Sequence, residues 1–592
     1  MSWSREDSAE ALFGRPVAVG VAPPRVAVVG EVAWFLLAGR RLVMLLTACS
    51  QGTVLPTMAR VTVPSSSRPR PAARAGAAAG PPAAESQQSR PKIHDVTITI
   101  DAEHPGPVVP GDFAGLSFER QALNRGNAGV TGRLFMSANN SLVTLFRNLG
   151  VRSLRIGGST VDWLAPAGAA GNYAPIDSLF AFATAAGAKV IYTLRLFSPA
   201  ADPAGDLKTI NAEIAGYIWR RWQRGVANFA FGNEPDWHAF HTYEGHPWDP
   251  AVYEETSGVP GTAYASYLAH WQGFADAVAA AAPGALLSGP DTGAYSTRTF
   301  TPDPDTGVSW TEQLVHDQKV SGRMAEITQH YYVGGQPNAV TAQQAIGNML
   351  SSQWVNDSSP GVQPGGTTYT PYPWLYTHIL GPVREAGLPY RLTESNDYLI
   401  GVPGASNAFA SALWALDYLH WWAAHGAAGV NFHNKQWLPA DVIVPGPAAS
   451  GERYVVTPKG YGIKAFTLGS AGRVKPAQIG NSAGMNLTAY CIGGAGEDYV
   501  TIINKTQGAE AADASITILP YGPGVQGVEI MTLASPEPGD ASAPSATLGG
   551  ASITGDSLWQ GAWSPLPTNP QGGIRVTVSA TTAVILRVPN GG

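Results

Sequence analysis

The sequence predicts an α/β fold: a (β/α)8 TIM barrel over residues 111–468 and a C-terminal antiparallel β-sandwich over residues 469–592. Two observations support this prediction. Between about residue 111 and residue 440, eight short apolar runs alternate with helical patterns or long loops, as in a closed parallel barrel. From about residue 469 the runs are short and rich in β-branched residues, and turns rather than helices separate them.

The expected barrel strands are residues 113–118, 152–156, 189–194, 227–232, 285–289, 326–331, 390–393 and 429–432. The expected amphipathic helices between them include residues 141–149, 179–186, 264–282 and 408–424. The span is longer than the roughly 250 residues usual for this fold. We therefore expect long loops at residues 236–261 and 334–373.

The expected strands of the sandwich are residues 487–491, 499–503, 514–519, 528–533 and 574–588. One further strand stands apart from both domains. Residues 96–100 alternate β-branched side chains with period two, inside a segment that we delimit as residues 92–110. We expect this strand to pair into the sandwich.

Residues 1–91 do not have the pattern of a folded domain. The apolar run 42–48 follows Arg40 and Arg41, as in the short apolar region of a secretory signal or anchor, and residues 64–91 are a Pro- and Ala-rich linker. No run reaches the roughly 18 apolar residues of a spanning helix, so we expect a secreted protein without stable membrane insertion. Sequons at Asn139, Asn356, Asn486 and Asn504 would then permit glycosylation.

Composition excludes several classes of partner. The formal net charge is -6 and the isoelectric point is near 6.1, so no basic field is available for nucleic acid. Cys49 and Cys491 are the only cysteines, which excludes a disulfide framework and any cysteine cluster with zinc-ligand spacing. We therefore expect no cofactor and no metal, and we expect a monomer.

Two carboxylates follow apolar runs of the predicted barrel. Glu234 ends the fourth run, where Pro235 stops the strand, and Glu394 ends the seventh. Catalytic groups of such barrels lie at the C-terminal ends of strands, and glycosidic bond hydrolysis requires a pair of carboxylates. A single glutamate at a strand end is commonly an ordinary turn or capping residue. A pair on strands four and seven is a more specific signal.

Short motifs around these runs resemble those of the clan A glycoside hydrolases, and most closely glycoside hydrolase family 79, the β-glucuronidase and heparanase-like enzymes. The resemblance extends from about residue 95 to the C-terminus. Its motifs are Gly115-Leu116-Ser117-Phe118-Glu119, Leu154-Arg155-Ile156-Gly157-Gly158-Ser159, Asn233-Glu234-Pro235, Gly289-Pro290-Asp291-Thr292-Gly293, His330-Tyr331-Tyr332 and Pro458-Lys459-Gly460-Tyr461-Gly462.

The resemblance implies that Glu234 is the general acid/base and Glu394 the nucleophile of a retaining mechanism. By the same resemblance Asn233 bonds the sugar 2-hydroxyl, and Tyr331 donates to Glu394 unless it is only a packed aromatic residue. Arg155 is expected to order the carboxylates from beneath, or to form a buried structural ion pair.

A uronic acid substrate requires a group that binds its carboxylate. The resemblance assigns this contact to the backbone of Gly460 and the phenol of Tyr461, with Tyr398 as a further candidate. Glu119 and Ser159 are implied to bind other hydroxyls of the sugar. Lys435 could add a positive charge but is expected to be a solvated loop residue.

The predicted function is therefore a retaining exo-β-glucuronidase acting on terminal β-D-glucuronic acid, or its 4-O-methyl form, in a glycan or glycoside. Three alternatives stay open. They are another clan A retaining β-glycosidase acting on neutral sugars, an endo-acting heparanase-like β-glucuronidase, and a non-catalytic carbohydrate-binding protein.

Overall fold

The computed structural model describes residues 92–126, 133–196, 207–238, 262–293, 308–337, 339–435, 437–447, 453–522, 525–567, 569 and 573–590. All of these belong to one compact unit, residues 88–592. The signal- or anchor-like segment and the linker expected in residues 1–91 lie outside the described residues.

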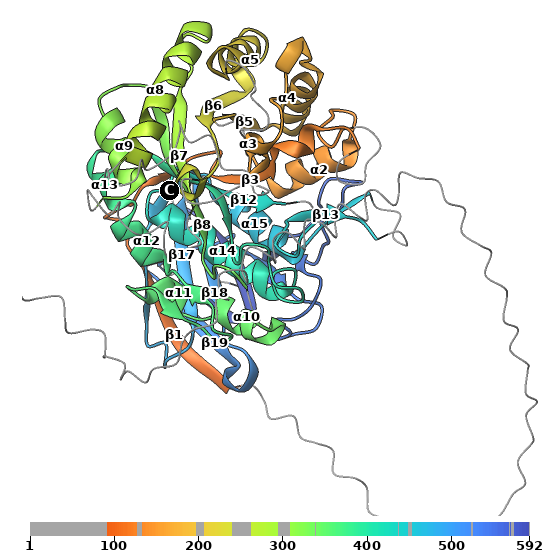
Figure 1. The fold of residues 1–592 in the computed structure, drawn as a ribbon. Coiled ribbons are helices and arrows are strands. Elements are labelled where there is room, and N and C mark those ends of the chain that lie inside the picture. The colour runs from red at the N-terminus through yellow and green to blue at the C-terminus, as the bar shows by residue number, and fades with distance from the viewer. Residues whose placement is uncertain are drawn as a thin grey trace, which may run out of the picture. The chain divides into compact units, whose positions relative to one another are not determined.

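Eight parallel strands close into a barrel, in the order β11-β12-β3-β4-β5-β6-β7-β8 (Figure 1). The strands are β3 (Ala114–Glu119), β4 (Ser153–Gly157), β5 (Lys189–Leu194), β6 (Val226–Phe231), β7 (Leu287–Thr292), β8 (Met324–Tyr332), β11 (Tyr390–Asn396) and β12 (Gly429–Asn434). Each coincides with one of the eight predicted runs to within a few residues. The predicted barrel is confirmed.

Helices follow the strands in the expected alternation. The longer ones are α2 (Asn140–Leu149), α4 (Ala174–Ala186), α5 (Leu207–Trp222), α8 (Thr262–Ala281), α9 (Trp310–Gln318), α10 (Ala342–Met349), α14 (Phe409–Ala424) and α15 (Pro458–Leu468). Helix α2 shows how the sequence ends such an element. Gly150 adopts the left-handed conformation, with φ of 70°, and its N–H donates to the carbonyls of Phe146 and Arg147.

The long loop expected at residues 334–373 contains structure of its own. Besides α10 it holds a short helix and a two-stranded hairpin, α11 (Gln353–Asn356), β9 (Gly361–Val362) and β10 (Thr368–Tyr369). It leads to the short helices α12 (Tyr372–His378) and α13 (Gly381–Glu385) before β11. The other expected loop begins with the short helix α6 (Pro235–His238), and residues 239–261 lie outside the described residues.

The C-terminal residues form a β-sandwich of two sheets. The first sheet contains β16 (Ala477–Gly480), β1 (Lys92–Ile100), β19 (Ala512–Leu519) and β23 (Ile574–Val578), in that order. The second contains β2 (Val108–Val109), β15 (Gly472–Lys475), β17 (Leu487–Gly493), β18 (Glu497–Asn504), β24 (Thr582–Pro589), β20 (Glu529–Ala534) and β21 (Thr547–Leu548), in that order. The short strand β22 (Ser564–Pro565) also pairs with β20. Apolar side chains of both sheets share one core cluster.

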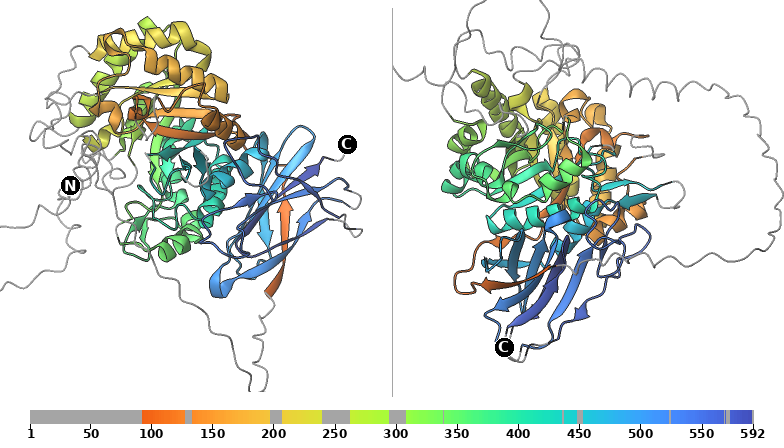
Figure 2. Two further views of the ribbon diagram at one scale, coloured as in Figure 1. Left: turned by 90° about the vertical axis from the view of Figure 1, so that its right-hand side faces the viewer. Right: turned by 90° about the horizontal axis from the view of Figure 1, so that it is seen from below.

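The N-terminal strand β1 lies inside this sandwich, where Figure 2 shows it in orange among blue strands. It pairs antiparallel with β16 but parallel with β19, so the sheet is not wholly antiparallel. The run expected at residues 574–588 is two strands, β23 and β24, which lie in different sheets.

Buried polar contacts join the barrel helix α14 to the sandwich. Asp417 of α14 accepts hydrogen bonds from Lys505 Nζ and from the hydroxyl of Tyr490, both at 2.7 Å. The ring of His420 stacks on Tyr490, with centroids 4.9 Å apart. The side chains of Lys505 and Asp417 are only 1% and 4% exposed. The barrel and the sandwich therefore share a desolvated joint.

Two of the four sequons are closed to glycosylation in the folded protein. Asn139 is 1% exposed and Asn504 is fully buried, and the side-chain amide of each donates to backbone carbonyls. Asn486 is half-buried and Asn356 is exposed. Among the described helices, none combines the length and the apolar character needed to cross a membrane.

Candidate active site

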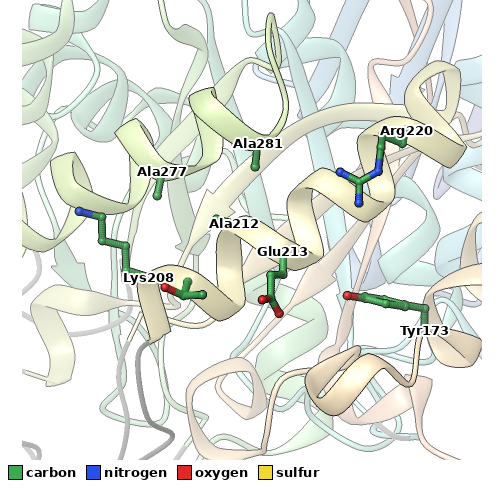
Figure 3. Close-up of a pocket in the computed structure, with 8 residues that line it drawn as sticks. Tyr173, Lys208, Ala212, Glu213, Arg220, Ala277 and Ala281 are labelled. Atoms are coloured by element: carbon green, nitrogen blue, oxygen red, sulfur yellow. The ribbon is translucent and has the colours of Figure 1, made fainter.

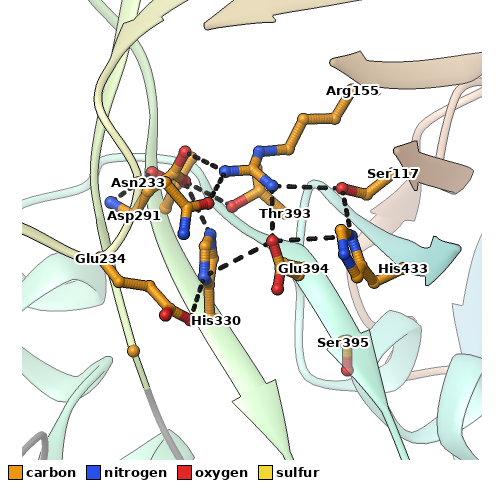
Figure 4. Close-up of polar contacts among 12 residues, drawn as sticks. Ser117, Arg155, Asn233, Glu234, Asp291, His330, Thr393, Glu394, Ser395 and His433 are labelled. Atoms are coloured by element: carbon orange, nitrogen blue, oxygen red, sulfur yellow. Dashed lines mark hydrogen bonds and ion pairs between the residues drawn. The ribbon is translucent and has the colours of Figure 1, made fainter. Parts of the chain in front are cut away.

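Two carboxylates meet at the C-terminal ends of the barrel strands. Glu234 follows β6, the fourth strand of the barrel, and Glu394 lies near the end of β11, the seventh. One oxygen of each carboxylate and a ring nitrogen of His330 all lie within 4.8 Å of one another. All three side chains are buried, and Figure 4 shows them converging. The structure thus brings together the two residues that the sequence analysis paired.

The backbone at Glu234 is strained. Its φ is 50°, in the left-handed region that residues with a side chain rarely adopt. Such a conformation costs on the order of 1–3 kcal/mol and persists where the surrounding structure enforces it. Asp291, near the end of β7, also has a positive φ, of 55°, and its carbonyl accepts a 3.0 Å hydrogen bond from the N–H of Glu234. The two strained residues therefore support each other.

Glu394 is surrounded by positive charge and donors. Arg155 Nη1 donates to its Oε2 at 2.9 Å, and the Tyr332 hydroxyl donates to its Oε1 at 2.7 Å. Burial opposes the negative charge, but His433, His330 and Arg155 outweigh it and hold the pKa of Glu394 well below its usual range. Glu394 is therefore ionised at neutral pH, as a nucleophile must be.

Arg155 links the groups beneath the site. It lies on β4, is fully buried, and its Nη2 donates to Asp291 Oδ2 at 3.0 Å and to Asn233 Oδ1 at 2.9 Å. Its Nη1 also reaches Ser117 at 3.1 Å, besides Glu394. A buried guanidinium is tolerable only when it is paired in this way. Arg155 therefore holds Glu394, Asp291 and Asn233 from beneath, through buried ion pairs and a hydrogen bond.

His330 connects the acid side of the site. Its Nδ1 lies 2.8 Å from Glu234 Oε1, and its Nε2 lies 3.7 Å from Asp291 Oδ1. Burial lowers the pKa of His330, but Glu394, Glu234 and Asp291 outweigh burial and raise it. Asp291 itself is held ionised, since Arg155 and His330 overcome its burial and lower its pKa.

Asp236, two residues after Glu234, is a further buried carboxyl group. Burial, with a smaller contribution from Glu234, raises the pKa of Asp236 to about 8, although the N–H of Gly293 donates to it at 3.1 Å. Asp236 is therefore mostly neutral at neutral pH and adds little negative charge beside Glu234.

The expected role of Tyr331 is wrong. Its hydroxyl donates to the carbonyl of Thr370 at 2.5 Å, and Tyr332 donates to Glu394 instead. Successive side chains of a strand point to opposite faces, so His330 and Tyr332 share the inner face of β8 and Tyr331 points outward. Tyr331 packs in an aromatic cluster with Tyr372 and Trp422. The alternation rule could have identified Tyr332 from the sequence.

The expected carboxylate contacts of Gly460 and Tyr461 are also wrong. Both lie in α15, which packs against the sandwich strands β20 and β21. The hydroxyl of Tyr461 accepts a 2.9 Å hydrogen bond from the N–H of Ile553 in the C-terminal region. The N–H of Gly460 is used within the helix start, donating to Thr457, and a Cβ there would strike Val456.

The hydroxyl of Tyr398, which the sequence analysis offered as a further contact to the substrate carboxylate, is engaged elsewhere. The hydroxyl accepts a 3.0 Å hydrogen bond from Asn348 of α10, and the ring packs edge-on against Trp354 of α11. These partners belong to the long segment between β8 and β11, whose fold the sequence patterns did not reveal. Tyr398 therefore anchors that segment.

Glu119 lies at the rim of the site. It is 2% exposed and accepts hydrogen bonds from the N–H and hydroxyl of Thr160 at 2.9 and 2.6 Å. Burial opposes its charge, but the neighbouring His433 and Lys435 lower the pKa of Glu119 to about 2. Ser159 is half-buried and directly precedes the short helix α3 (Thr160–Trp163). It is therefore the neighbour of Thr160, which bonds to Glu119.

Lys435 is a partly solvated residue after the end of β12, as the sequence analysis expected, but it also pairs with a buried carboxylate. Its Nζ lies 3.7 Å from Glu119 Oε1, and its side chain is 42% exposed. Its N–H donates to Asp441 at 2.9 Å, which fixes the backbone just after β12. Burial opposes its charge, but Glu119, Glu394 and Glu234 together raise the pKa of Lys435. Lys435 therefore presents a positive charge beside Glu119, within electrostatic reach of Glu394 and Glu234.

Sequence reasoning did not assign roles to Asp291, His330 and His433. Asp291 and His330 belong to motifs at the ends of predicted barrel strands, so their positions in the sequence could have identified them as site residues. His433, on β12, lies 3.6 Å from Glu394 Oε2 and 3.1 Å from Ser117 Oγ through the same Nδ1. The role of His433 depends on which side chains lie beside it in the closed barrel, and no local sequence pattern indicates that.

Glu234, His330 and Glu394 are also the kinds of residue that ligate metals. Here, however, both oxygens of Glu394 already accept hydrogen bonds, one of them from the guanidinium of Arg155. A divalent cation bound there would lie beside that fixed positive charge. The donor set therefore suits acid–base and nucleophilic chemistry better than metal binding.

A hollow of about 530 Å³ lies elsewhere, on the outer layer of helices α4, α5 and α8 (Figure 3). Its lining residues are Tyr173, Lys208, Thr209, Ala212, Glu213, Arg220, Ala277 and Ala281. None of them comes from the strand ends that carry Glu234 and Glu394.

Comparison with known proteins finds neither a matching family model nor a matching curated protein. Solved structures do share the fold. A 4-O-α-L-rhamnosyl-β-D-glucuronidase from Fusarium oxysporum 12S aligns with a TM-score of 0.57 and 16% identity, over 83% of this chain and 99% of the enzyme.

Two other solved structures align to a similar extent. CelM2, a bifunctional glucanase-xylanase from a metagenome library, has a TM-score of 0.57 and 15% identity, over 84% of this chain and all of the enzyme. The GH51 arabinofuranosidase from Xanthomonas axonopodis pv. citri has a TM-score of 0.56 and 14% identity, over 84% of this chain and all of the enzyme. At such identities the likeness establishes the shared fold, and these three structures are glycoside hydrolases.

Proposed function

We propose that this protein is a retaining glycoside hydrolase. The observation that carries the proposal is the carboxylate pair at the ends of barrel strands four and seven, with an oxygen of each within 4.8 Å. Retaining enzymes need carboxyl groups about 5–5.5 Å apart, whereas inverting enzymes need at least about 6.5 Å to admit a water. This upper limit lies below the separation that an inverting enzyme needs, which supports direct attack by one carboxylate.

The surroundings of the two carboxylates support different roles for them. Glu394, paired with Arg155 and Tyr332, is the nucleophile, and Glu234, bonded to His330, is the acid and base. In the first step Glu234 gives a proton to the glycosidic oxygen as its bond to the anomeric carbon breaks, and Glu394 bonds to that carbon. In the second step Glu234 takes a proton from water, whose oxygen displaces Glu394. Two inversions give retention.

Asn233 has a defined place in this mechanism. Its N–H donates to Asp162 at 2.9 Å, and its Oδ1 accepts from Arg155. The amide is therefore oriented with Nδ2 as the donor for a substrate hydroxyl, in the role that the sequence resemblance implies. Glu119 can accept a hydrogen bond from another hydroxyl of the sugar.

We propose further that the substrate is a β-D-glucuronide cleaved from the chain end. Three observations support this substrate. The strand-end motifs resemble family 79, one structure of the same fold is a glucuronidase, and Lys435 offers a positive charge beside the carboxylates. The alternative is a neutral sugar. The positions of Gly460 and Tyr461 favour it, because the N–H of Gly460 bonds to Thr457 and the hydroxyl of Tyr461 bonds to Ile553.

A substrate panel tests the proposal. Wild type and the Glu394→Gln variant are assayed on aryl β-D-glucuronide, β-D-glucoside and β-D-xyloside. We expect wild type to turn over the glucuronide appreciably and the other two sugars poorly, and we expect Glu394→Gln to remove nearly all activity. Equal turnover of the three glycosides would contradict the glucuronide proposal and favour a neutral sugar as the substrate. Full activity of Glu394→Gln would exclude the nucleophile assignment.

A further inference from the structure

We infer that Asp291 is a positioning residue that acts on the acid Glu234 through His330. Its carboxylate faces the far nitrogen of the imidazole and retains the transferable proton in the Glu234–His330 pair. The inference rests on the proposed function, because that proton is the one the hydrolytic reaction delivers.

The geometry forms a chain of three side chains from three neighbouring strands. Glu234 Oε1 lies 2.8 Å from Nδ1 of His330, and Nε2 of the same ring lies 3.7 Å from Asp291 Oδ1. His330 is fully buried, and within the described residues its Nε2 has no hydrogen-bond partner. A buried ring nitrogen with a carboxylate oxygen nearby is suited to carry a proton.

The backbone couples the two ends of this chain. Glu234 and Asp291 both have positive φ, and the N–H of Glu234 donates to the carbonyl of Asp291. Strained residues persist where other contacts over-determine them. The paired strain therefore fixes the Asp291 carboxylate relative to the carboxylate that donates the proton.

Asp291 is kept as a permanent negative charge. Arg155 Nη2 donates to one of its oxygens at 3.0 Å, and the Thr393 hydroxyl donates to the other at 2.5 Å. The N–H of Asp291 is held by the hydroxyl of Thr328 at 3.1 Å. The oxygen that faces His330 thus belongs to a carboxylate that does not itself take up the proton at neutral pH.

Several other charged groups face the Glu234–His330 pair. Glu394 adds negative charge and Arg155 positive charge directly at His330, while Asp236 and Lys435 act on Glu234 from farther away. A negative charge beside the ring favours the proton-bearing form of the pair, whichever atom holds the proton. Three carboxylates interact with His330 without being its hydrogen-bond partner. Of these, Glu394 is consumed as the nucleophile, and Asp236 is mostly neutral at neutral pH. Asp291 keeps its charge throughout the reaction.

The bond changes are those of the proposed double displacement, and Asp291 forms and breaks no bond. The pair loses one proton to the leaving oxygen in the first step and regains one from water in the second. Removal of the Asp291 charge should therefore weaken proton retention while leaving the nucleophile in place.

The test compares Asp291→Asn with wild type on two glycosides of whichever sugar the substrate panel identifies. One leaving group is phenol, which needs protonation, and the other is 2,4-dinitrophenol, which does not. General acid catalysis contributes roughly 10²–10⁴-fold, so we expect kcat/KM for the phenyl glycoside to fall about 10- to 100-fold. For the dinitrophenyl glycoside we expect a change of less than about threefold, because no acid is required.

The pH profile provides a second readout. Without the negative charge the pair loses its proton at lower pH, so the basic limb of kcat/KM should move to lower pH in Asp291→Asn. Thr328→Val is the matched control: it removes a hydrogen-bond partner of Asp291 but keeps the charge, and it should leave the limb in place. Equal losses on both glycosides with an unmoved limb would show that Asp291 is only structural.

Histidine NMR separates this inference from the proposed function. The imidazole signal of His330, assigned by its loss in His330→Gln, should titrate at lower pH in Asp291→Asn than in wild type. If no glycoside is turned over but this shift is present, the hydrolase proposal fails and the coupling stands. An unshifted titration would overturn the coupling even in an active enzyme.

Discussion

At the scale of single residues, Lys435 is an exposed positive charge at the candidate active site. The charged side chains around it are nearly inaccessible: Arg155 is 0% exposed, Glu119 2% and Glu394 7%. Lys435 is 42% exposed and has its Nζ 3.7 Å from Glu119. An incoming sugar can therefore reach this ammonium group, and a uronate carboxylate would gain an ion pair there.

Replacement of Lys435 with methionine should separate acidic from neutral substrates. Hydrogen bonds to charged groups contribute about 1.5–3 kcal/mol, so we expect kcat/KM for the glucuronide to fall roughly 10- to 100-fold. The slower turnover of the glucoside should change less than about threefold. Lys189→Met, at the exposed start of β5, is the control and should affect neither substrate. A parallel loss on both sugars would mean that Lys435 only supports Glu119.

At the scale of one element, successive side chains of strand β8 alternate between the barrel interior and the surrounding helices. His330 and Tyr332 face the barrel interior, and Tyr331 between them faces the helices. The two neighbouring tyrosines therefore have different functions, although the sequence shows them side by side. One supports the nucleophile and the other supports the fold.

Single tyrosine-to-phenylalanine variants should expose this difference. Tyr332→Phe removes a hydrogen bond to charged Glu394, and we expect kcat/KM to fall about 10-fold or more with little change in the unfolding midpoint. Tyr331→Phe removes a buried bond to Thr370, and we expect near-normal kinetics with stability lowered by about 1 kcal/mol. Kinetics and urea unfolding of both variants provide the check. The reverse pattern would contradict the assignment.

At the scale of the whole molecule, the barrel and the sandwich depend on the joint around Asp417. Lys505 and Tyr490 of the sandwich both donate to this carboxylate of α14. Burial lowers the pKa of the adjacent His420 to about 3, so its ring is neutral in the folded protein at neutral pH. The joint is therefore a buried polar contact, and loss of one member would leave its buried partner uncompensated.

Asp417→Asn should destabilise the protein as a whole. Removal of one charge of a buried pair leaves the other uncompensated and costs on the order of 3–5 kcal/mol. Asp276→Asn breaks the exposed pair with Arg323 and should cost less than about 1 kcal/mol. Thermal melts of both variants measure the difference. Equal midpoints would show that the joint contributes little to stability.

Much of the fold was predictable because it depends on local patterns. The eight barrel runs were apparent from apolar residues bounded by turn signals, and each strand end then located a candidate side chain. Glu234 and Glu394 could be paired for that reason. The segment between β8 and β11 was not predictable, since its short helices and two-residue strands are held by tertiary contacts such as that between Tyr398 and Asn348.

The sequence by itself determined the barrel, the sandwich and the two strand-end glutamates, because period-two and helical patterns record which faces are buried. Only the tertiary structure decided which groups surround those glutamates. Arg155, Asp291, His330 and Lys435 lie on different strands or loops, and their contacts depend on how the closed barrel sets neighbouring strands in register. For the same reason the hydroxyl of Tyr461 bonds to the N–H of Ile553 in the C-terminal region, a contact that the sequence patterns did not reveal.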